Sequence, residues 1–176
     1  MPTPHQQFDA EALYRDLLTQ LRAGLEGVSD AAIVGIHSGG AWLAQRLAAD
    51  LGLEARLGSI DVSFYRDDYA KKGLHPDVKP THIPFNVDGA VIVLVDDVLY
   101  TGRTTRAAIN VLFDYGRPAR IMLAALADRA GRELPVAADF VAAHVELAPG
   151  QSLSLQREVG GERDNLLSLT IEDDHA

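Results

Sequence analysis

The sequence predicts an α/β fold in which a central, mostly parallel β-sheet is flanked by helices. Unbroken apolar runs at residues 31–36, 90–95 and 121–127 are typical of parallel strands that are buried on both faces. Between these runs, apolar residues recur at helical spacing, as expected for the helices that connect parallel strands.

The first third of the chain predicts two helices and two strands. Four apolar residues at helical spacing indicate a first helix that ends near Gly27; they are Tyr14, Leu18, Leu21 and Leu25. The strand at 31–36 follows, and then a second helix at 39–51. Residues 59–64 alternate between polar and apolar types, which predicts a strand with one wetter face.

Residues 66–84 interrupt this pattern with charges, a glycine and three prolines. Long loops in compact domains are usually functional, so we expect a flexible flap that closes over a site and excludes water. A plain surface insertion is the alternative.

The next elements form a strand–helix–strand unit. After the strand at 90–95, apolar spacing predicts a helix that runs to Tyr115 and is ended by Gly116 and Pro118. A further buried strand is expected at 121–127.

The C-terminal third predicts a small β hood. Weak alternation at 152–156 and 166–171 indicates two short antiparallel strands, joined as a hairpin across Gly160 and Gly161. The acidic residues 172–174 are interpreted as a solvated tail.

Composition limits the class of protein. At 176 residues and 47% hydrophobic, the chain suits one domain over residues 1–176 with a substantial core. It has no cysteine, so disulfides and thiolate metal sites are excluded. No apolar run approaches the length of a membrane span and the first residues lack signal-peptide features, so we expect a cytoplasmic protein without membrane contact.

The chemically informative segment begins where the strand at 90–95 ends. Asp96 and Asp97 come next, at the sheet edge where open α/β sheets bind ligands. The turn at 99–105 then opens a helix with a glycine and three threonines, which is suited to cradling a phosphate. Carboxylates would repel a phosphate, so they favour the hydroxyls of an attached ribose, with Mg²⁺ nearby. The segment predicts a ribose phosphate site.

The alternative is that the acid pair serves only as a turn and helix-cap device. Capping does not explain the glycine and threonines that follow four residues later. Neither a G-x-x-x-x-G-K-[ST] motif nor a G-x-G-x-x-G motif after the first strand is present, so P-loop and dinucleotide-binding folds are not indicated.

The stretch VIVLVDDVLYTGRTT at 91–105 resembles the phosphoribosyl diphosphate (PRPP) signature of type I phosphoribosyltransferases. Its DDVLYTGRT portion resembles the PyrR family of bifunctional pyrimidine operon attenuators with uracil phosphoribosyltransferase activity. The match continues through IDVSFYRDD at 60–68, GRP at 116–118 and DRAGRELP at 128–135, and therefore covers most of the chain.

The resemblance implies a role for each matching position. Asp96, Asp97 and Arg66 would be the catalytic residues, with Arg66 in a flap that opens at 65–68. Asp128 and Arg129 would lie beside uracil. The pyrophosphate loop would contain Ser38, Gly39 and Gly40. The PRPP-binding set would be Asp96, Asp97, Val98, Leu99, Tyr100, Thr101, Gly102, Arg103, Thr104 and Thr105.

The implied reaction converts uracil and PRPP to UMP and pyrophosphate, with Mg²⁺ as cofactor. The metal would be carried by PRPP, and Asp96 is the candidate for any direct protein ligand. The implied partners are PRPP, uracil, UMP, the leader of pyr mRNA and further copies of the chain in a homodimer or tetramer.

The chain departs from the family pattern mostly by losing basic residues. Many members read Thr-Arg-Gly where this chain reads Ser38-Gly39-Gly40, so backbone amides or Arg66 must make the arginine's contact. Ala130 and Gly131 stand where glycine and histidine are common, and residues 137–144 replace a segment that usually includes an arginine and a lysine.

The formal net charge of −9, from 16 basic and 25 acidic residues, weighs against pyr mRNA as a partner, because RNA binding depends on Lys and Arg. The candidates for a local basic face are few: Arg15, Arg22, Lys71, Lys72 and Lys79. Three alternatives to a uracil transferase remain open. They are an RNA-binding regulator with little or no catalytic activity, a nucleotide-binding scaffold without activity, and a sibling enzyme that uses orotate or a purine.

Overall fold

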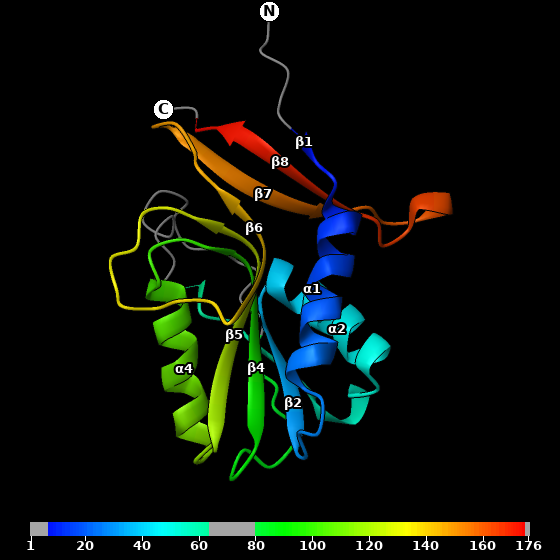
Figure 1. The fold of residues 1–176 in the computed structure, drawn as a ribbon, viewed down its shortest axis with the longest axis vertical. Coiled ribbons are helices and arrows are strands. Elements are labelled where there is room, and N and C mark those ends of the chain that lie inside the picture. Colours follow the sequence, from blue (N-terminus) through cyan, green and yellow to red (C-terminus); the bar gives the residue numbers. More distant parts are fainter. Residues whose placement is uncertain (1–6, 64–79, 175–176) are drawn as a thin grey trace, which may run out of the picture.

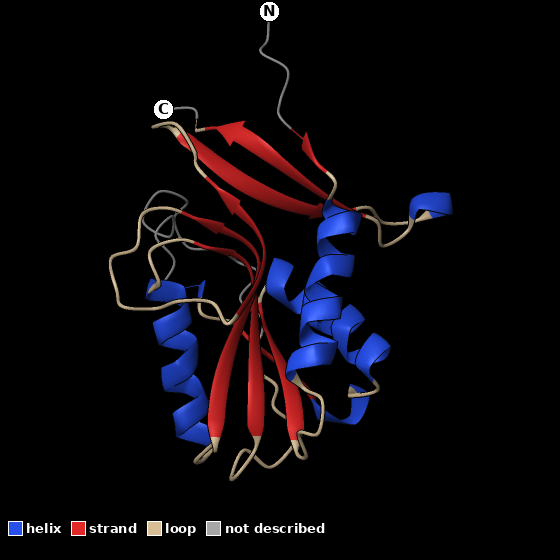
Figure 2. Cartoon of the chain, in the orientation of Figure 1, coloured by secondary structure: helices blue, strands red, loops and turns tan. Residues whose placement is uncertain are grey.

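The computed structural model describes residues 7–63 and 80–174. In this part of the chain, a five-stranded parallel sheet is covered by helices on both faces, and a three-stranded antiparallel sheet lies beyond one of its ends (Figure 1). The predicted α/β class with a C-terminal β hood is confirmed (Figure 2). Within the described residues, no helix is both long and apolar enough to cross a membrane.

The central sheet has the strand order β3-β2-β4-β5-β6, and every neighbouring pair is parallel. Its strands are β2 (Ala31–Ile36), β3 (Leu57–Ile60), β4 (Val91–Leu99), β5 (Arg120–Arg129) and β6 (Phe140–Val145). The chain builds outward from β2 to β3 and then from β4 through β5 to β6. The topological switch therefore lies between the carboxyl ends of β2 and β4, which is where ligands bind in open α/β sheets.

Three helices pack on this sheet: α1 (Ala10–Gly24), α2 (Gly39–Leu51) and α4 (Arg103–Tyr115). Asp9 begins α1 by accepting the N–H of Ala12 on its carboxylate at 3.0 Å, and Gly52 ends α2 in the left-handed conformation at φ 71°. Short 3-10 turns lie at Glu54–Arg56 and Gly161–Arg163.

The buried residues form two clusters, one on each face of the sheet. Leu17 and Leu21 of α1 and Leu43 and Leu47 of α2 pack with Val93 on one face. On the other face, α4 packs on alternate residues of the same strands; the fully buried members include Leu112, Ile92, Leu94 and Val34. Each fully buried Leu or Ile side chain contributes roughly 1.5–3 kcal/mol of transfer free energy.

The hood is formed by β1 (Gln7–Phe8), β7 (Gln151–Arg157) and β8 (Leu167–Asp173), in the order β1-β8-β7. Leu155 and Leu169 from the hood belong to the same buried cluster as α1 and α2. The hood is therefore fixed above the carboxyl ends of the central strands, as Figure 1 shows.

A charged network fixes the N-terminal half of α1 to α2 and β8. Arg46 donates to both carboxylate oxygens of Glu11, at 2.9 and 2.8 Å, and the N–H of Leu167 donates to the same carboxylate at 2.9 Å. The hydrogen bonds from Arg46 hold the pKa of Glu11 below its usual value. Next to this pair, burial and a hydrogen bond to Asp50 raise the pKa of Tyr14.

Several predicted boundaries were wrong. β3 runs over Leu57–Ile60, not 59–64, because the chain turns where Asp61 accepts the N–H of Ser63 at 2.9 Å. β4 continues to Leu99 instead of ending at Val95, since β5 pairs with it beyond that point. Within the first helix, Leu17 is fully buried and Leu18 only partly.

Two strands were not predicted from the sequence patterns. The edge strand β6 contains two alanines, which have low β-propensity, and the N-terminal strand β1 is only two residues long. Residues 172 and 173 continue β8 opposite β7, so the acidic segment is not merely a solvated tail. The predicted hairpin across Gly160 and Gly161 is confirmed.

Candidate functional site

The site lies at the carboxyl edge of the sheet, where β4 extends beyond its neighbour β2. The β2–β4 ladder ends with Gly35 opposite Val95, whereas β5 follows β4 as far as Leu99. Along this unpaired side, Asp96 accepts the N–H of Asp97 on Oδ1 at 2.9 Å, and Asp97 accepts the N–H of Val98 on its own Oδ1 at 2.8 Å. Each carboxylate thus uses one oxygen for the local backbone.

The two carboxylates point to different sides, as alternation along a strand requires. Asp97 faces the start of α2, because a Cβ placed on Gly39 would lie 2.5 Å from Asp97 Oδ2. Asp96 is 3% exposed and lines a pocket on the side of α4. The predicted pair is therefore divided between the turn before α2 and the turn before α4.

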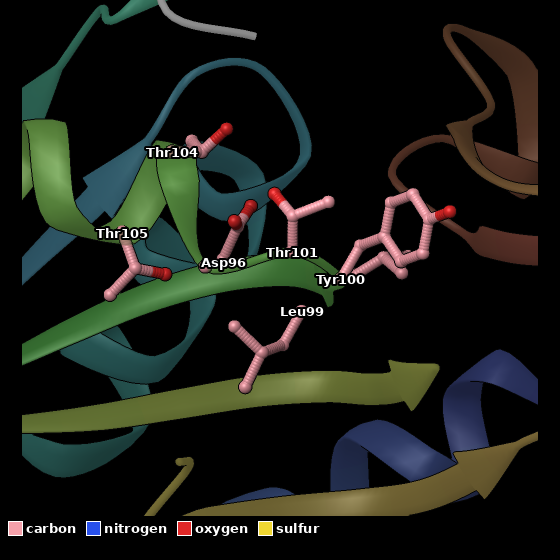
Figure 3. A pocket seen from close by; sticks show the side chains of 8 residues that line it. Asp96, Leu99, Tyr100, Thr101, Thr104 and Thr105 are labelled. Atoms are coloured by element: carbon pink, nitrogen blue, oxygen red, sulfur yellow. The ribbon is translucent and has the colours of Figure 1, made fainter. Parts of the chain in front are cut away.

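The pocket next to Asp96 contains about 230 Å³ of empty space and is open to solvent. Figure 3 shows the carboxylate of Asp96 on the same side of β4 as the hydroxyls of Thr101 and Thr104. The lining residues are Asp96, Val98, Leu99, Tyr100, Thr101, Gly102, Thr104 and Thr105. The structure thus brings together eight of the ten residues expected to bind PRPP; Asp97 and Arg103 are not in this lining.

The amino end of α4 provides the anion-binding character of this pocket. Gly102 precedes the helix with φ 92°, a conformation that favours glycine. The hydroxyl of Thr101 accepts the N–H of Arg103 at 3.2 Å, the first amide of the helix. The first helical hydrogen bond comes from the N–H of Arg106 to Gly102, so the amides of Thr104 and Thr105 precede it. With no acidic residue in the first turn, the positive end of the helix dipole faces the pocket.

The turn before α2 forms a second helix amino end at the same edge. Ser38 precedes the helix without a side-chain capping bond, and the first turn contains no acid. Gly40 lies so close to the carbonyl of Val95 that a Cβ would collide with it. Gly39 is therefore placed beside Asp97 and Gly40 beside Val95, with Ser38 immediately before them in the chain. The peptide bond between His37 and Ser38 is cis.

Asp128 and Arg129, at the end of β5, lie beside the pocket. Leu99 is the register partner of Asp128, and the guanidinium of Arg129 lies over the ring of Tyr100 at 3.8 Å from its centroid. Arg129 Nε is buried and has no hydrogen-bond partner. Asp128 forms an ion pair with Arg132 at 2.8 Å.

The segment 130–136, called here the base loop, packs directly on the turn before α4. The carbonyl of Thr101 accepts the N–H groups of Glu133 and Leu134 at 2.9 and 3.1 Å. Arg132 donates to the carbonyl of Tyr100 at 2.7 Å, and Arg103 forms an ion pair with Glu133. The sequence did not single out Arg132; its only signal was membership of the DRAGRELP segment.

Arg66, the expected flap at 65–68 and the lysines at 71, 72 and 79 lie outside the described residues. Arg15 and Arg22 are on the exposed side of α1, where Arg22 donates to the carbonyl of Asp50 at 3.1 Å.

Comparison with known proteins identifies relatives across most of the chain. The family described as "Phosphoribosyl transferase domain" matches residues 5–148. "Bifunctional protein PyrR" of Ralstonia nicotianae is 55% identical over 158 residues, covering 89% of this chain and 90% of that protein. The protein of the same name from Nitrosococcus oceani is 50% identical over 149 residues, covering 82% and 84%.

Solved structures agree on the fold. A purine phosphoribosyltransferase from Pyrococcus horikoshii is 28% identical, with a TM-score of 0.59 over 80% of this chain and 87% of that one. A hypoxanthine-guanine-xanthine phosphoribosyltransferase is 15% identical, with a TM-score of 0.61 over 92% and 90%. The second likeness concerns the fold alone.

Proposed function

We propose that this chain, which belongs to the PyrR family of type I phosphoribosyltransferases, transfers the phosphoribosyl group of PRPP to uracil and so forms UMP and pyrophosphate. The observation that carries the proposal is the pocket that the buried Asp96 lines together with the amino end of α4, where the first helical turn contains no acidic residue. Such a pocket suits a ligand that is anionic at one end and rich in hydroxyls at the other.

The 5′-phosphate would bind at the amino end of α4. Donors are available there from the amides of Thr104 and Thr105 and from the threonine hydroxyls. The first turn contains no acidic side chain that would repel the phosphate. Asp96, with Asp97 on the adjoining side, would accept hydrogen bonds from the ribose hydroxyls. The amino end of α2, with Gly39 and Gly40, would receive the pyrophosphate on its backbone N–H groups.

Mg²⁺ would arrive with PRPP. No cluster of three or more His, Cys, Asp or Glu residues able to hold a metal exists among residues 7–63 and 80–174. One or two carboxylates together with substrate phosphates and water are the usual donor set for Mg²⁺, and Asp96 fits as the protein's contribution. When bound, the metal neutralises charge on the departing pyrophosphate.

Uracil would bind where β5 ends. The guanidinium of Arg129 lies over the face of Tyr100 and its Nε has no hydrogen-bond partner among the described residues, so an N–H group can donate to a carbonyl oxygen of the base. Asp128, held by Arg132 through Oδ2, can accept a base N–H on its other oxygen. A paired acceptor and donor match the alternating N–H and C=O groups of uracil.

In the reaction, the bond from the anomeric carbon to pyrophosphate breaks and a bond from that carbon to N1 of uracil forms, while the N1 proton is lost. Positive charge develops on the ribose, by analogy with glycosyl transfer. The acidity of N1 removes the need for a strong base, and no side chain is assigned that role. The residues of the site hold phosphate, diol and base in line and exclude water.

The test is release of pyrophosphate from PRPP in the presence of uracil, with orotate, hypoxanthine and guanine as controls. We expect turnover with uracil and with none of the three other bases. For Asp96→Asn we expect kcat/KM to fall by at least about 100-fold. Turnover that is unaffected by this substitution would overturn the site, and turnover with another base would overturn the substrate.

A second activity is favoured by the word "bifunctional" in the name of the relatives. We propose regulation of pyrimidine operon transcription through pyr leader RNA as that activity, with UMP or PRPP as the sensed ligand. The net charge of −9 requires any RNA surface to be local. A gel shift with leader RNA at two salt concentrations tests it; no shift at low salt would exclude it.

We further propose that residues 1–176 act as one domain and associate as a homodimer or tetramer. Support for one domain comes from the shared core, in which Leu155 and Leu169 of the hood pack with Leu17 and Val93. A single cooperative unfolding transition, together with the molar mass from light scattering, tests both statements.

A further inference from the structure

Arg132 of the base loop bonds both to the turn before α4 and to the end of β5. The guanidinium of Arg132 donates from Nε to the carbonyl of Val136 at 2.7 Å, from Nη1 to the carbonyl of Tyr100 at 2.7 Å and from Nη2 to Asp128 Oδ2 at 2.8 Å. The side chain is 25% exposed and that of Asp128 is 16% exposed, so these bonds are partly shielded from water. Three acceptors from three segments thus converge on one planar group.

This arrangement determines the direction of the backbone in the turn at 99–105, called here the phosphate turn. In a trans peptide the N–H points opposite to the C=O of the preceding residue. The carbonyl of Tyr100 points toward Arg132, and that of Thr101 points toward the N–H groups of Glu133 and Leu134. The N–H groups of Thr101 and Gly102 therefore point away from the base loop, on the side of the pocket.

The same guanidinium determines the position of the base-site carboxylate. Asp128 Oδ2 accepts from Arg132, while His144 Nδ1 is 4.0 Å away from the same oxygen on a side chain that is 77% exposed. Arg132 is thus the close cationic partner of Asp128. Movement of Arg132 would displace the carboxylate and the Tyr100 carbonyl together.

We propose that Arg132 is a positioning residue that couples the base site to the 5′-phosphate site, an inference that rests on the proposed function. It touches neither substrate. It aligns Asp128 for the base and the amides of the phosphate turn for the anion, so occupation of one site orders the other. A planar fork is required, because a lysine ammonium at the same position cannot serve three acceptors in these directions.

The test measures the Kd of ribose 5-phosphate by calorimetry, with and without saturating uracil, for wild type, Arg132→Met and Arg132→Lys. We expect both variants to bind ribose 5-phosphate about tenfold more weakly, which corresponds to the loss of about one hydrogen bond to the phosphate. We also expect the ratio of the two Kd values to differ from one in wild type and to approach one in the variants. A merely structural role would not change this ratio.

Arg163→Met serves as the control, since Arg163 lies in the hood hairpin, is 73% exposed and pairs with Glu158 at 3.5 Å. If Arg132→Lys shows the same Kd values and the same ratio as wild type, the proposal is overturned. If Arg132→Met fails to fold, the result for Arg132→Lys decides. Ribose 5-phosphate binding does not depend on uracil turnover. Failure of the proposed transferase reaction would therefore be seen separately, as absent pyrophosphate release by wild type.

Discussion

The carboxylate of Asp97 lies against Gly39, at a separation that leaves no room for a side chain on the glycine: a Cβ there would be 2.5 Å from Oδ2. This contact joins the end of β4 to the first residue of α2. It places a helix amino end next to one carboxylate, while the amino end of α4 lies next to the other, Asp96. Two anion-binding ends thus flank two acids at the switch point of the sheet.

Replacement of Gly39 by alanine should displace Asp97 and the start of α2 together. We expect kcat/KM for PRPP to fall by about 100-fold, because displacements near 1 Å in positioning groups have costs of this size. The measurement is steady-state pyrophosphate release at varied PRPP. Gly150→Ala is the control: its φ of 78° makes it strained by roughly 1 kcal/mol, but open space surrounds it. Equal losses in both variants would contradict the assignment.

Thr104→Val removes one hydroxyl from the phosphate pocket without changing side-chain volume much. Hydrogen bonds to charged groups contribute about 1.5–3 kcal/mol, so the Kd of ribose 5-phosphate should rise by about tenfold or more. Isothermal titration provides the measurement. Thr19→Val, which removes a hydroxyl that donates to the carbonyl of Arg15 at 2.9 Å on α1, should leave this Kd unchanged. An unchanged Kd for Thr104→Val would remove its hydroxyl from the phosphate site.

Arg129→Met should weaken the base site selectively. The buried Nε and the stacking on Tyr100 mark Arg129 as a donor held ready for a ligand. We expect the KM for uracil to rise by about tenfold, with the Kd of ribose 5-phosphate within about twofold of wild type. Tyr100→Phe keeps the aromatic face and should retain activity. A defect confined to PRPP binding would place Arg129 elsewhere in the mechanism.

The Glu11–Arg46 pair should make stability depend on pH. Its hydrogen bonds lower the pKa of Glu11 in the folded state, so the pair stabilises the fold above the unfolded-state pKa, for which 4.5 is the reference value. This stabilisation is lost as pH falls through the folded-state pKa. Glu11→Gln should therefore lower the free energy of unfolding at neutral pH and have less effect in acid. Denaturant titrations across this range measure the difference.

Glu26→Gln, at an exposed position in the turn that follows the same helix, is the control for this pH series, and its effect on unfolding should be small at every pH. A Glu11→Gln effect that stays constant from neutral to acidic pH would show that Glu11 contributes by packing and not by charge.

The elements that were predicted correctly are those whose residues determine their structure without help from distant parts of the chain. The strand at 31–36 and the helix at 39–51 were predicted to the residue, because a continuous apolar run and its flanking glycines decide them locally. β6 was missed, since its alanines become a strand only through pairing with β5. Long-range pairing likewise extends β4 through Asp96 and Asp97 to Leu99.

The site shows the same division. The turn at 99–105 was predicted as an anion site because its glycine and threonines are consecutive in the chain. Arg132 could not be selected from the sequence, since its role depends on the carbonyl of Tyr100, 32 residues earlier. The contact of Asp97 with Gly39 likewise could not be predicted, because it depends on the pairing of β2 with β4.

The most direct test of the account is a crystal structure of the protein with UMP. We predict that the phosphate contacts the amides of Thr104 and Thr105, that the ribose hydroxyls reach Asp96, and that the uracil ring lies beside Arg129. A phosphate bound away from the amino end of α4, with Asp96 still enclosed by its own backbone contacts, would contradict the account.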